Sequence, residues 1–230
     1  MKVTFIHHSS FLVESRSAML LFDYYQGPLP SLDGAKPLYI LTSHKHGDHY
    51  GKIIYSIADT HPDVRYILSG DVPQRDLPAG FKCPVTYIDP HQEYQDELLK
   101  VRTLMSNDRG VAFVCEVDGK KIYHGGDLNN WCWDKGETAL EDERIYHKEL
   151  GRIKKDVFDV AFIPMDTRLK DYRLGIDDFM QYSDAKTIFP MHLWDKFNMI
   201  REYLSLDTCA AYRDRIRVIE RDGQEFDNDA

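Results

Sequence analysis

The chain has 230 residues, of which 43% are hydrophobic and 29% charged, and its formal net charge is −9. This composition is typical of a globular protein, and no stretch approaches the roughly 18 to 20 consecutive apolar residues that a membrane span needs. The negative charge argues against a general affinity for nucleic acid or anionic lipid, so we expect a small-molecule substrate. We interpret residues 1–230 as a single domain in which 221–230 form a frayed polar tail.

Short apolar runs separated by Gly, Pro and Asp predict strands along most of the chain. In order, the expected strands are 3–6, 11–13, 19–22, 38–41, 66–68, 111–117, 121–124, 160–163, 187–189 and 216–219. Asp118-Gly119 is a hairpin signal between the sixth and seventh of these. Helical spacing or composition predicts helices from about 53 to 61 and over 137–155, 177–182 and 196–204. This order favours an α/β protein with two packed sheets and helices outside them.

Cysteine usage and the first residues favour a cytoplasmic location. The four cysteines are scattered and form no Cys-x-x-Cys pair, which disfavours a disulfide framework and a thiolate zinc ribbon. The N-terminal residues read as a strand and lack the basic start and apolar stretch of a signal peptide.

The most informative segment is the polar run Ser43-His44-Lys45-His46-Gly47-Asp48-His49, which directly follows an apolar strand. In extended backbone, His44 and His46 point to the same side and can bind one metal ion. Gly47 permits a sharp turn, after which Asp48 and His49 project from the entrance of the next helix. Capping alone does not explain three histidines and an aspartate here, and this concentration indicates metal coordination.

The motif His44-x-His46-x-Asp48-His49 resembles the signature of the metallo-β-lactamase superfamily. Two later segments are similar to that family's motifs: His124-Gly125-Gly126-Asp127 and Phe189-Pro190-Met191-His192. The start, His8-Ser9-Ser10-Phe11 followed by Leu21-Phe22-Asp23, resembles the opening hairpins of the branch that includes ascorbate-6-phosphate lactonase. The resemblance implies a four-layer αββα sandwich and metal ligands His44, His46, Asp48, His49, Asp127 and His192.

One ligand of that family is missing from this chain. The family has a further histidine just before the segment equivalent to Gly110-Val111, where this chain has Ser106-Asn107-Asp108-Arg109. Asn107 or Asp108 is a candidate substitute through a side-chain oxygen, and His124 is a candidate either as a ligand or as its hydrogen-bonded support. Asp23 is expected to support a ligand, with a plain turn residue as the alternative.

The expected activity is hydrolysis by water that a divalent cation activates, with one or two Zn²⁺ ions, or Mn²⁺ or Fe²⁺, as the cofactor. Asp127 would bridge the two ions or anchor a single one, and Asp48 would orient the attacking water or carry its proton. The resemblance favours a phosphorylated lactone, a phosphodiester or another small ester as substrate. The alternatives are a nuclease of the same fold and a metal-binding or ligand-sensing domain that has lost turnover.

Three further residues are candidates for substrate binding. Asn129 and Trp131 follow Asp127 and could form a pocket wall, although a packing cluster is the alternative for the tryptophan. Arg168 suits a phosphate or carboxylate substrate, with a solvated charge run as the alternative. The resembling branch also makes a homo-oligomer an expectation.

Overall fold

The structure is a computed structural model that describes residues 1–133 and 136–228. Its larger sheet has seven strands in the order β15-β1-β2-β3-β4-β5-β6, and its second sheet has six in the order β14-β12-β10-β9-β8-β7. The strands of the larger sheet are β1 (Lys2–His7), β2 (Ser10–Glu14), β3 (Met19–Phe22), β4 (Leu38–Thr42), β5 (Val64–Ser69), β6 (Val85–Ile88) and β15 (Gln224–Asp227). Those of the second are β7 (Glu93–Gln95), β8 (Leu99–Met105), β9 (Val111–Val117), β10 (Lys120–His124), β12 (Val160–Pro164) and β14 (Ile188–Met191).

The two sheets pack face to face because alternate side chains of each strand point to opposite faces. Phe5, Phe11 and Phe22 of the larger sheet belong to the apolar core that the second sheet shares. Their neighbours Ile6, Leu12 and Leu21 belong to a separate core on the outer face of the larger sheet.

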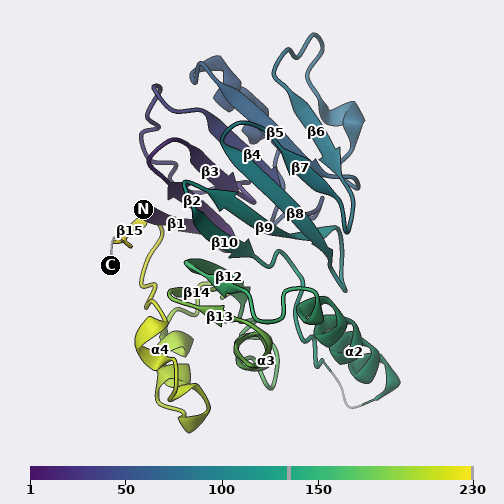
Figure 1. Ribbon diagram of the computed structural model, residues 1–230, viewed down its shortest axis with the longest axis vertical. Helices are drawn as coiled ribbons and strands as arrows, with labels where there is room; N and C mark the ends of the chain where they lie inside the picture. The colour runs from purple at the N-terminus through teal and green to yellow at the C-terminus, as the bar shows by residue number, and fades with distance from the viewer. Residues whose placement is uncertain (134–135, 229–230) are drawn as a thin grey trace.

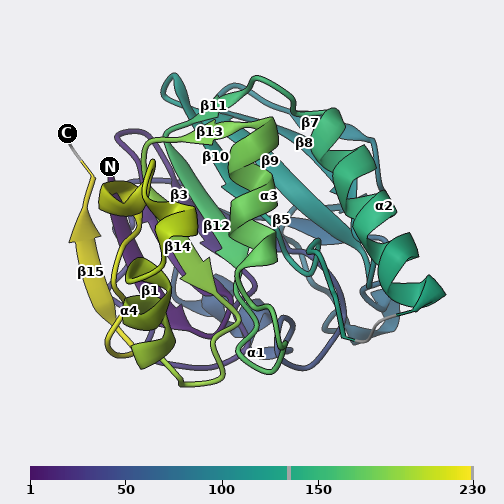
Figure 2. The ribbon, with the colours of Figure 1, turned by 90° about the horizontal axis from the view of Figure 1, so that it is seen from below.

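Helices cover the outside of this sandwich. Helix α1 (Ile53–Ser56) contributes its buried residues to the outer core of the larger sheet. Helices α2 (Glu137–Gly151), α3 (Leu174–Tyr182) and α4 (Asn198–Leu204) lie on the opposite side, beyond the six-stranded sheet (Figures 1 and 2). The short strands β11 (Val157–Phe158) and β13 (Asp184–Ala185) form a separate pair. The layering confirms the expected αββα sandwich.

Several local expectations were wrong. The helix after His49 is a single turn, α1, extended by a 3-10 turn over Ile57–Asp59, and α2 ends at Gly151 rather than at residue 155. Residues 216–219 form no strand, and Ile216 makes an isolated bridge to Ile188.

The tail is also more ordered than its polar composition suggested. Residues 224–227 form β15, which pairs with β1 at the edge of the larger sheet. The ring of Phe226 packs against Phe189 with centroids 5.0 Å apart, so one apolar anchor holds an otherwise polar segment. Residues 229 and 230, the end of the expected frayed tail, lie outside the described residues. In the described part of the chain, no helix is long and apolar enough to cross a membrane.

Candidate metal centre

The candidate ligands gather at one edge of the sandwich, where several strands end. The Ser43 to His49 run follows β4, Asp127 follows β10 and His192 follows β14. Strands β10, β12 and β14 are parallel to one another, so their carboxyl ends meet at the same edge. The tight turn between β1 and β2 adds His8 to this edge, where the His192 N–H donates to the His8 carbonyl at 3.2 Å.

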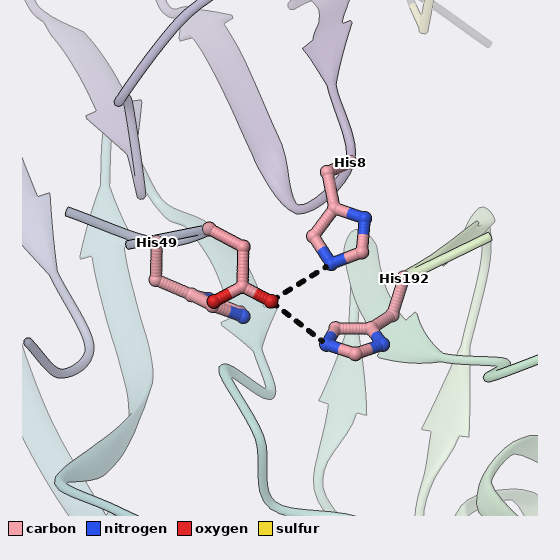
Figure 3. A group of neighbouring side chains, drawn as sticks. His8, His49 and His192 are labelled. Atoms are coloured by element: carbon pink, nitrogen blue, oxygen red, sulfur yellow. Dashed lines mark ion pairs between the residues drawn. The ribbon is translucent and has the colours of Figure 1, made fainter. Parts of the chain in front are cut away.

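Two groups of donor side chains meet here, and within each the candidate ligand atoms lie within 4.8 Å of one another. The inner group consists of His8, Asp48, His49 and His192. The outer group consists of His44, His46, Asp108 and Asp127. The rings of His8 and His192 point at one carboxylate oxygen (Figure 3). Asp48 Oδ2 lies 3.6 Å from His8 Nε2 and 3.9 Å from His192 Nε2.

Asp127 belongs to the outer group and also faces the inner group with its other carboxylate oxygen. Its Oδ1 lies 3.1 Å from His49 Nε2 and 3.5 Å from His192 Nε2. Its Oδ2 lies 3.4 Å from His44 Nε2 in the outer group. A carboxylate with this placement suits the bridging role expected of Asp127.

Three of the imidazoles are oriented by a partner at Nδ1, which leaves Nε2 directed at the centre. His49 Nδ1 lies 2.8 Å from Asp23 Oδ2, and His192 Nδ1 lies 2.9 Å from Asp166 Oδ2. His44 Nδ1 lies 3.0 Å from the Ser43 hydroxyl. A carboxylate at Nδ1 accepts a proton there, and so presents the lone pair of Nε2 to a metal.

The buried atoms at the centre test whether these residues fit a cation. Among the described residues, the ligand atoms without a hydrogen-bond partner include Nε2 of His8, His44, His49 and His192, together with Asp127 Oδ1. Leaving a buried polar atom unsatisfied costs about 1–3 kcal/mol. His49 Nε2 and Asp127 Oδ1 lie 3.1 Å apart and form an ion pair, but the other three atoms lie 3.4 Å or more from a carboxylate oxygen, and a cation among them would satisfy all five. Imidazole nitrogens and carboxylate oxygens are ligands of divalent transition metals, so the donor set fits.

The charge states of the centre agree with this reading. Burial lowers the pKa of His8 to about 2 and that of His44 to about 3, so both imidazoles are neutral and able to bind metal. Burial opposes the ionised form of Asp127, yet His49 and His192 hold its pKa well below the ordinary value. Despite its burial, His49 has a raised pKa because Asp127 and Asp23 flank it. In the metal-free protein, the His49 proton supplies the positive charge that these carboxylates require.

The backbone at the centre adopts conformations that only a well-packed surrounding can hold. His8, Asp23 and His192 have φ values of 55°, 45° and 64°, in the left-handed region that non-glycine residues rarely occupy. Such conformations cost about 1–3 kcal/mol each and cluster at functional sites. At Gly126, with φ of 51°, an added Cβ would lie 2.7 Å from the Ser43 Cβ, so glycine is required just before Asp127.

A cavity of about 480 Å³ opens beside the centre. Its lining includes His46, Asp48, Asn107, Asp108, Asp127, Trp131, Trp133, Asp142, Arg168, His192 and Trp194. The Arg168 guanidinium lies over the Trp194 ring at 4.2 Å and over the Trp133 ring at 5.1 Å. The Nε and Nη2 atoms of Arg168 donate hydrogen bonds to the Asp166 carboxylate. Arg168 is thus a fixed positive charge in the cavity wall.

The two candidate substitutes for the missing histidine differ in what they contact. The Asn107 amide nitrogen donates to the carbonyls of Asn129 and Asp142, and its oxygen accepts from the Asn129 N–H at 3.2 Å. Its polar atoms therefore brace the loop, and Asn107 belongs to neither donor group. Asp108 belongs to the outer group, where its Oδ2 lies 3.6 Å from His46 Nδ1.

Both ring nitrogens of His124 have backbone hydrogen-bond partners. Its Nε2 lies 2.9 Å from the Ser9 carbonyl, its Nδ1 accepts from the Gly126 N–H at 3.2 Å, and its ring stacks on Phe22. It therefore braces the backbone next to both His8 and Asp127 instead of joining a donor group. Asp23 accepts from the backbone N–H and hydroxyl of Ser43, at 2.7 Å each, in addition to its contact with His49.

The structure separates the two substrate-binding candidates that follow Asp127. Asn129 is fully buried and does not line the cavity, because its side chain packs against Gly175, where an added Cβ would lie 2.1 Å from Asn129 Oδ1. Trp131 does line the cavity, and its indole N–H donates to the Asp127 carbonyl at 2.9 Å.

Sequence reasoning missed His8 as a donor and Asp166 as the partner of His192. His8 is separated from the other donors by more than thirty residues, but it follows β1 as His44 follows β4, and that placement at a strand end was the available signal. Asp166 follows β12 in the same way.

Comparison with known proteins places the chain in a family. A family model described as a beta-lactamase superfamily domain matches residues 2–192. A UPF0173 metal-dependent hydrolase of Desulforamulus reducens is 29% identical over 211 residues, covering 84% of each chain. A relative of the same name from Natranaerobius thermophilus is 26% identical over 204 residues, covering 84% of this chain and 83% of the relative.

Two solved structures are similar in fold. Igni18, a metallo hydrolase from Ignicoccus hospitalis, gives a TM-score of 0.67 at 17% identity, with 98% of both chains covered. An isothiocyanate hydrolase from Delia radicum gut bacteria gives 0.60 at 16% identity, with 99% of both covered. At such identities the likeness shows the fold alone, since one fold hosts many chemistries. Because the family model covers most of its length, the chain belongs to the beta-lactamase superfamily and has the metallo-β-lactamase fold.

Proposed function

We propose that this protein is a metal-dependent hydrolase of small anionic esters, with a phosphodiester or a phosphorylated lactone as the substrate class. The observation that carries the proposal is the convergence of unpartnered buried donors from two groups on Asp127, beside a cavity of about 480 Å³. The names of the curated relatives, which are metal-dependent hydrolases at 26% and 29% identity, support the same reaction type.

Divalent cations held by such donors polarise an ester or phosphoryl oxygen and lower the pKa of water from about 15.7 towards 7. The chain itself supplies positioning and proton transfer. The Asp48 side chain is 30% exposed and lines the cavity, so it can orient a water molecule and accept its proton. Asp127 is held in place by its neighbours and keeps the donors of both groups together.

The preference for an anionic substrate follows from Arg168. Its guanidinium is fixed between Trp133 and Trp194 and lines the same cavity as Asp48. A planar, pre-oriented guanidinium suits a phosphate or carboxylate group. Trp133 and Trp194 are 49% and 39% exposed and offer apolar area for the rest of a small molecule. The opening hairpin with His8-Ser9-Ser10 resembles that of the lactonase-like branch, and this resemblance favours a phosphorylated lactone or phosphodiester as the substrate.

The test is hydrolysis of a chromogenic phosphodiester, a neutral acetate ester and a phosphorylated lactone after loading with Zn²⁺ or Mn²⁺. We expect turnover of the anionic substrates that Asp127→Ala abolishes. Arg168→Ala should raise KM for them about tenfold or more while KM for the neutral ester changes little, with Arg173→Ala as the control because Arg173 lies outside the cavity lining. Metal binding without turnover of any probe would contradict the enzyme and favour a binding domain. Cleavage of single-stranded DNA in preference to the small probes would instead indicate a nuclease.

A further inference from the structure

We propose that the two donor groups hold metal ions of unequal character. The inner group retains a nitrogen-preferring ion such as Zn²⁺, whereas the outer group binds a second, exchangeable ion and tolerates oxygen-preferring ions such as Mn²⁺. This inference rests on the metal dependence proposed above and is independent of the substrate.

The two groups differ in the chemistry of their donors. The inner group offers the imidazoles of His8, His49 and His192 with one carboxylate. The outer group offers two imidazoles and two carboxylates, and its member Asp108 lies in the segment where the resemblance implies a further histidine. Imidazole favours zinc and other late transition metals, whereas carboxylates suit manganese and magnesium. Replacing a nitrogen by an oxygen therefore weakens zinc binding selectively at the outer group.

The donors of the two groups also differ in solvent exposure. In the inner group, the side chains of His8, His49 and His192 are 4%, 0% and 3% exposed. In the outer group, His46 and Asp108 are 41% and 45% exposed and line the cavity. The fourth inner donor, Asp48, is 30% exposed, and Asp48 and His192 line the same cavity. Three buried imidazoles therefore shield the inner ion, whereas the outer ion is held partly by two exposed side chains that compete with water. The outer ion is therefore expected to exchange faster.

The two groups also differ in how firmly their donors are held. Asp23 fixes His49 at 2.8 Å and Asp166 fixes His192 at 2.9 Å, while the His192 backbone N–H donates to the His8 backbone carbonyl at 3.2 Å. The two carboxylates orient the His49 and His192 rings before any ion binds, which lowers the entropic cost of binding. His46 and Asp108 face each other at 3.6 Å near the surface, so ordering them costs more.

His8 also affects how many positions remain open on each ion. Together with Asp48, His49, His192 and the facing oxygen of Asp127, it brings the donors directed at the inner position to five. Metal sites closed by protein ligands are typically structural, whereas catalytic sites keep a position open. Donors of both groups line the cavity, but fewer donors are directed at the outer position, so we expect the substrate to meet the outer ion.

The experiment titrates Zn²⁺ and Mn²⁺ separately into the metal-free full chain, followed by dialysis against a weak chelator and measurement of ions per chain. Absorption of the Co²⁺-loaded protein reports the coordination of each ion without any activity assay. We expect two steps for Zn²⁺, with about one ion retained after dialysis and Mn²⁺ lost more readily. Two Zn²⁺ ions that bind and leave together would overturn the inference while leaving the proposed function intact. A chain that binds no ion would overturn both.

Variants at the outer group test the role of Asp108. Asp108→Asn should weaken the second step about tenfold or more and leave the first unchanged. Asp142→Asn is the matched control, since Asp142 lines the same cavity but belongs to neither group. Asp108→His restores a third imidazole and should tighten the second Zn²⁺ step while weakening the preference for Mn²⁺. An unchanged second step in Asp108→His would overturn the assignment.

Variants at the inner group test His8. His8→Asn should weaken the first step about tenfold or more, and asparagine tolerates the left-handed backbone at this position. His91→Asn is the matched control, because His91 has φ of 64° and lies outside both groups. Circular dichroism of the metal-free variants checks that they fold. If His8→Asn and His91→Asn retain the first ion equally well, His8 is not a ligand and the inference fails.

Discussion

Asp23 offers a sharp test of the centre because it touches no substrate and belongs to neither donor group. It is fully buried, and its carboxylate lies 2.8 Å from His49 Nδ1 and accepts from both the N–H and the hydroxyl of Ser43. Burial alone would raise the pKa of Asp23, but the imidazoles of His124 and His49 hold it below the ordinary value. An ionised Asp23 therefore keeps a proton on His49 Nδ1 and leaves Nε2 to face the centre.

Asp23→Asn reverses this hydrogen bond. Asparagine tolerates the backbone φ of 45° and keeps one carbonyl oxygen for the Ser43 N–H. Its amide nitrogen, however, would donate to His49 Nδ1, which moves the ring proton to Nε2 and blocks the lone pair that a metal needs. Loss of such a supporting partner lowers metal affinity about 10- to 100-fold, equivalent to roughly 1.4–2.7 kcal/mol.

The assay is competition between the protein and a chromophoric chelator for Zn²⁺, with unfolding of the metal-free protein measured separately. Asp33→Asn is the control, since Asp33 is an exposed turn residue. We expect Asp23→Asn to lose affinity while remaining folded in the assay buffer. If Asp23→Asn binds Zn²⁺ as tightly as the wild type, the tautomer of His49 is not set by Asp23 and the reasoning is refuted.

Three further outcomes are expected. Removing the metal with EDTA should lower the free energy of unfolding of the wild type by about 2.7 kcal/mol when the free ion stands at 100 times Kd. EDTA should destabilise Asp127→Ala less, because this variant lacks a ligand, and an equal destabilisation of both proteins would contradict the site. Gly110→Ala places a Cβ 2.0 Å from the Ser43 carbonyl oxygen, at a φ of 63°, whereas the Cβ of Gly119→Ala meets no atom and adds only backbone strain of about 1–2 kcal/mol. Chemical denaturation should therefore show a larger loss of unfolding free energy for Gly110→Ala. Equal losses in the two variants would contradict the close approach at Gly110. Partial burial opposes ionisation of Asp96, but the Tyr94 and Tyr39 hydroxyls, backbone N–H groups and Arg65 hold its pKa below the ordinary value. The ionised carboxylate therefore stabilises the fold above about pH 4, and this stabilisation is lost as the pH falls further. Asp96→Asn should flatten the acid side of the stability curve, and an unchanged curve would contradict this.

The layered fold was predictable where burial imposes a simple pattern. The strands 19–22, 38–41 and 160–163 are apolar throughout because both of their faces are covered, and the structure places strands there. The strand β8 was missed although its alternation of apolar residues with Lys100 and Arg102 is typical of a strand with one face buried. The edge strand β15 was missed because its stability comes from pairing with β1 and from Phe226, both distant in sequence.

The donors that lie within one short motif after β4 could also be predicted from the sequence. His44, His46, Asp48 and His49 lie within six residues, so local geometry alone brings them together. His8 carried no such signal, because its approach depends on the turn after β1 lying against the segment after β14. A contact between backbone segments about 180 residues apart is a property of the sheet order, which a local pattern does not encode.

The choice between Asn107 and Asp108 shows the same limit at short range. Both side chains carry an oxygen, both follow β8 and neither is fixed by periodicity, so the sequence left them equivalent. The structure separates them because the backbone groups of Asn129 and Asp142 need a partner, and only an amide can both donate to their carbonyls and accept the Asn129 N–H. A carboxylate at 107 could not donate, and an amide at 108 would bind metal weakly. Asn107 thus braces the loop, whereas Asp108 lies in the outer donor group, and exchanging the two residues should destabilise the loop and weaken metal binding at that group.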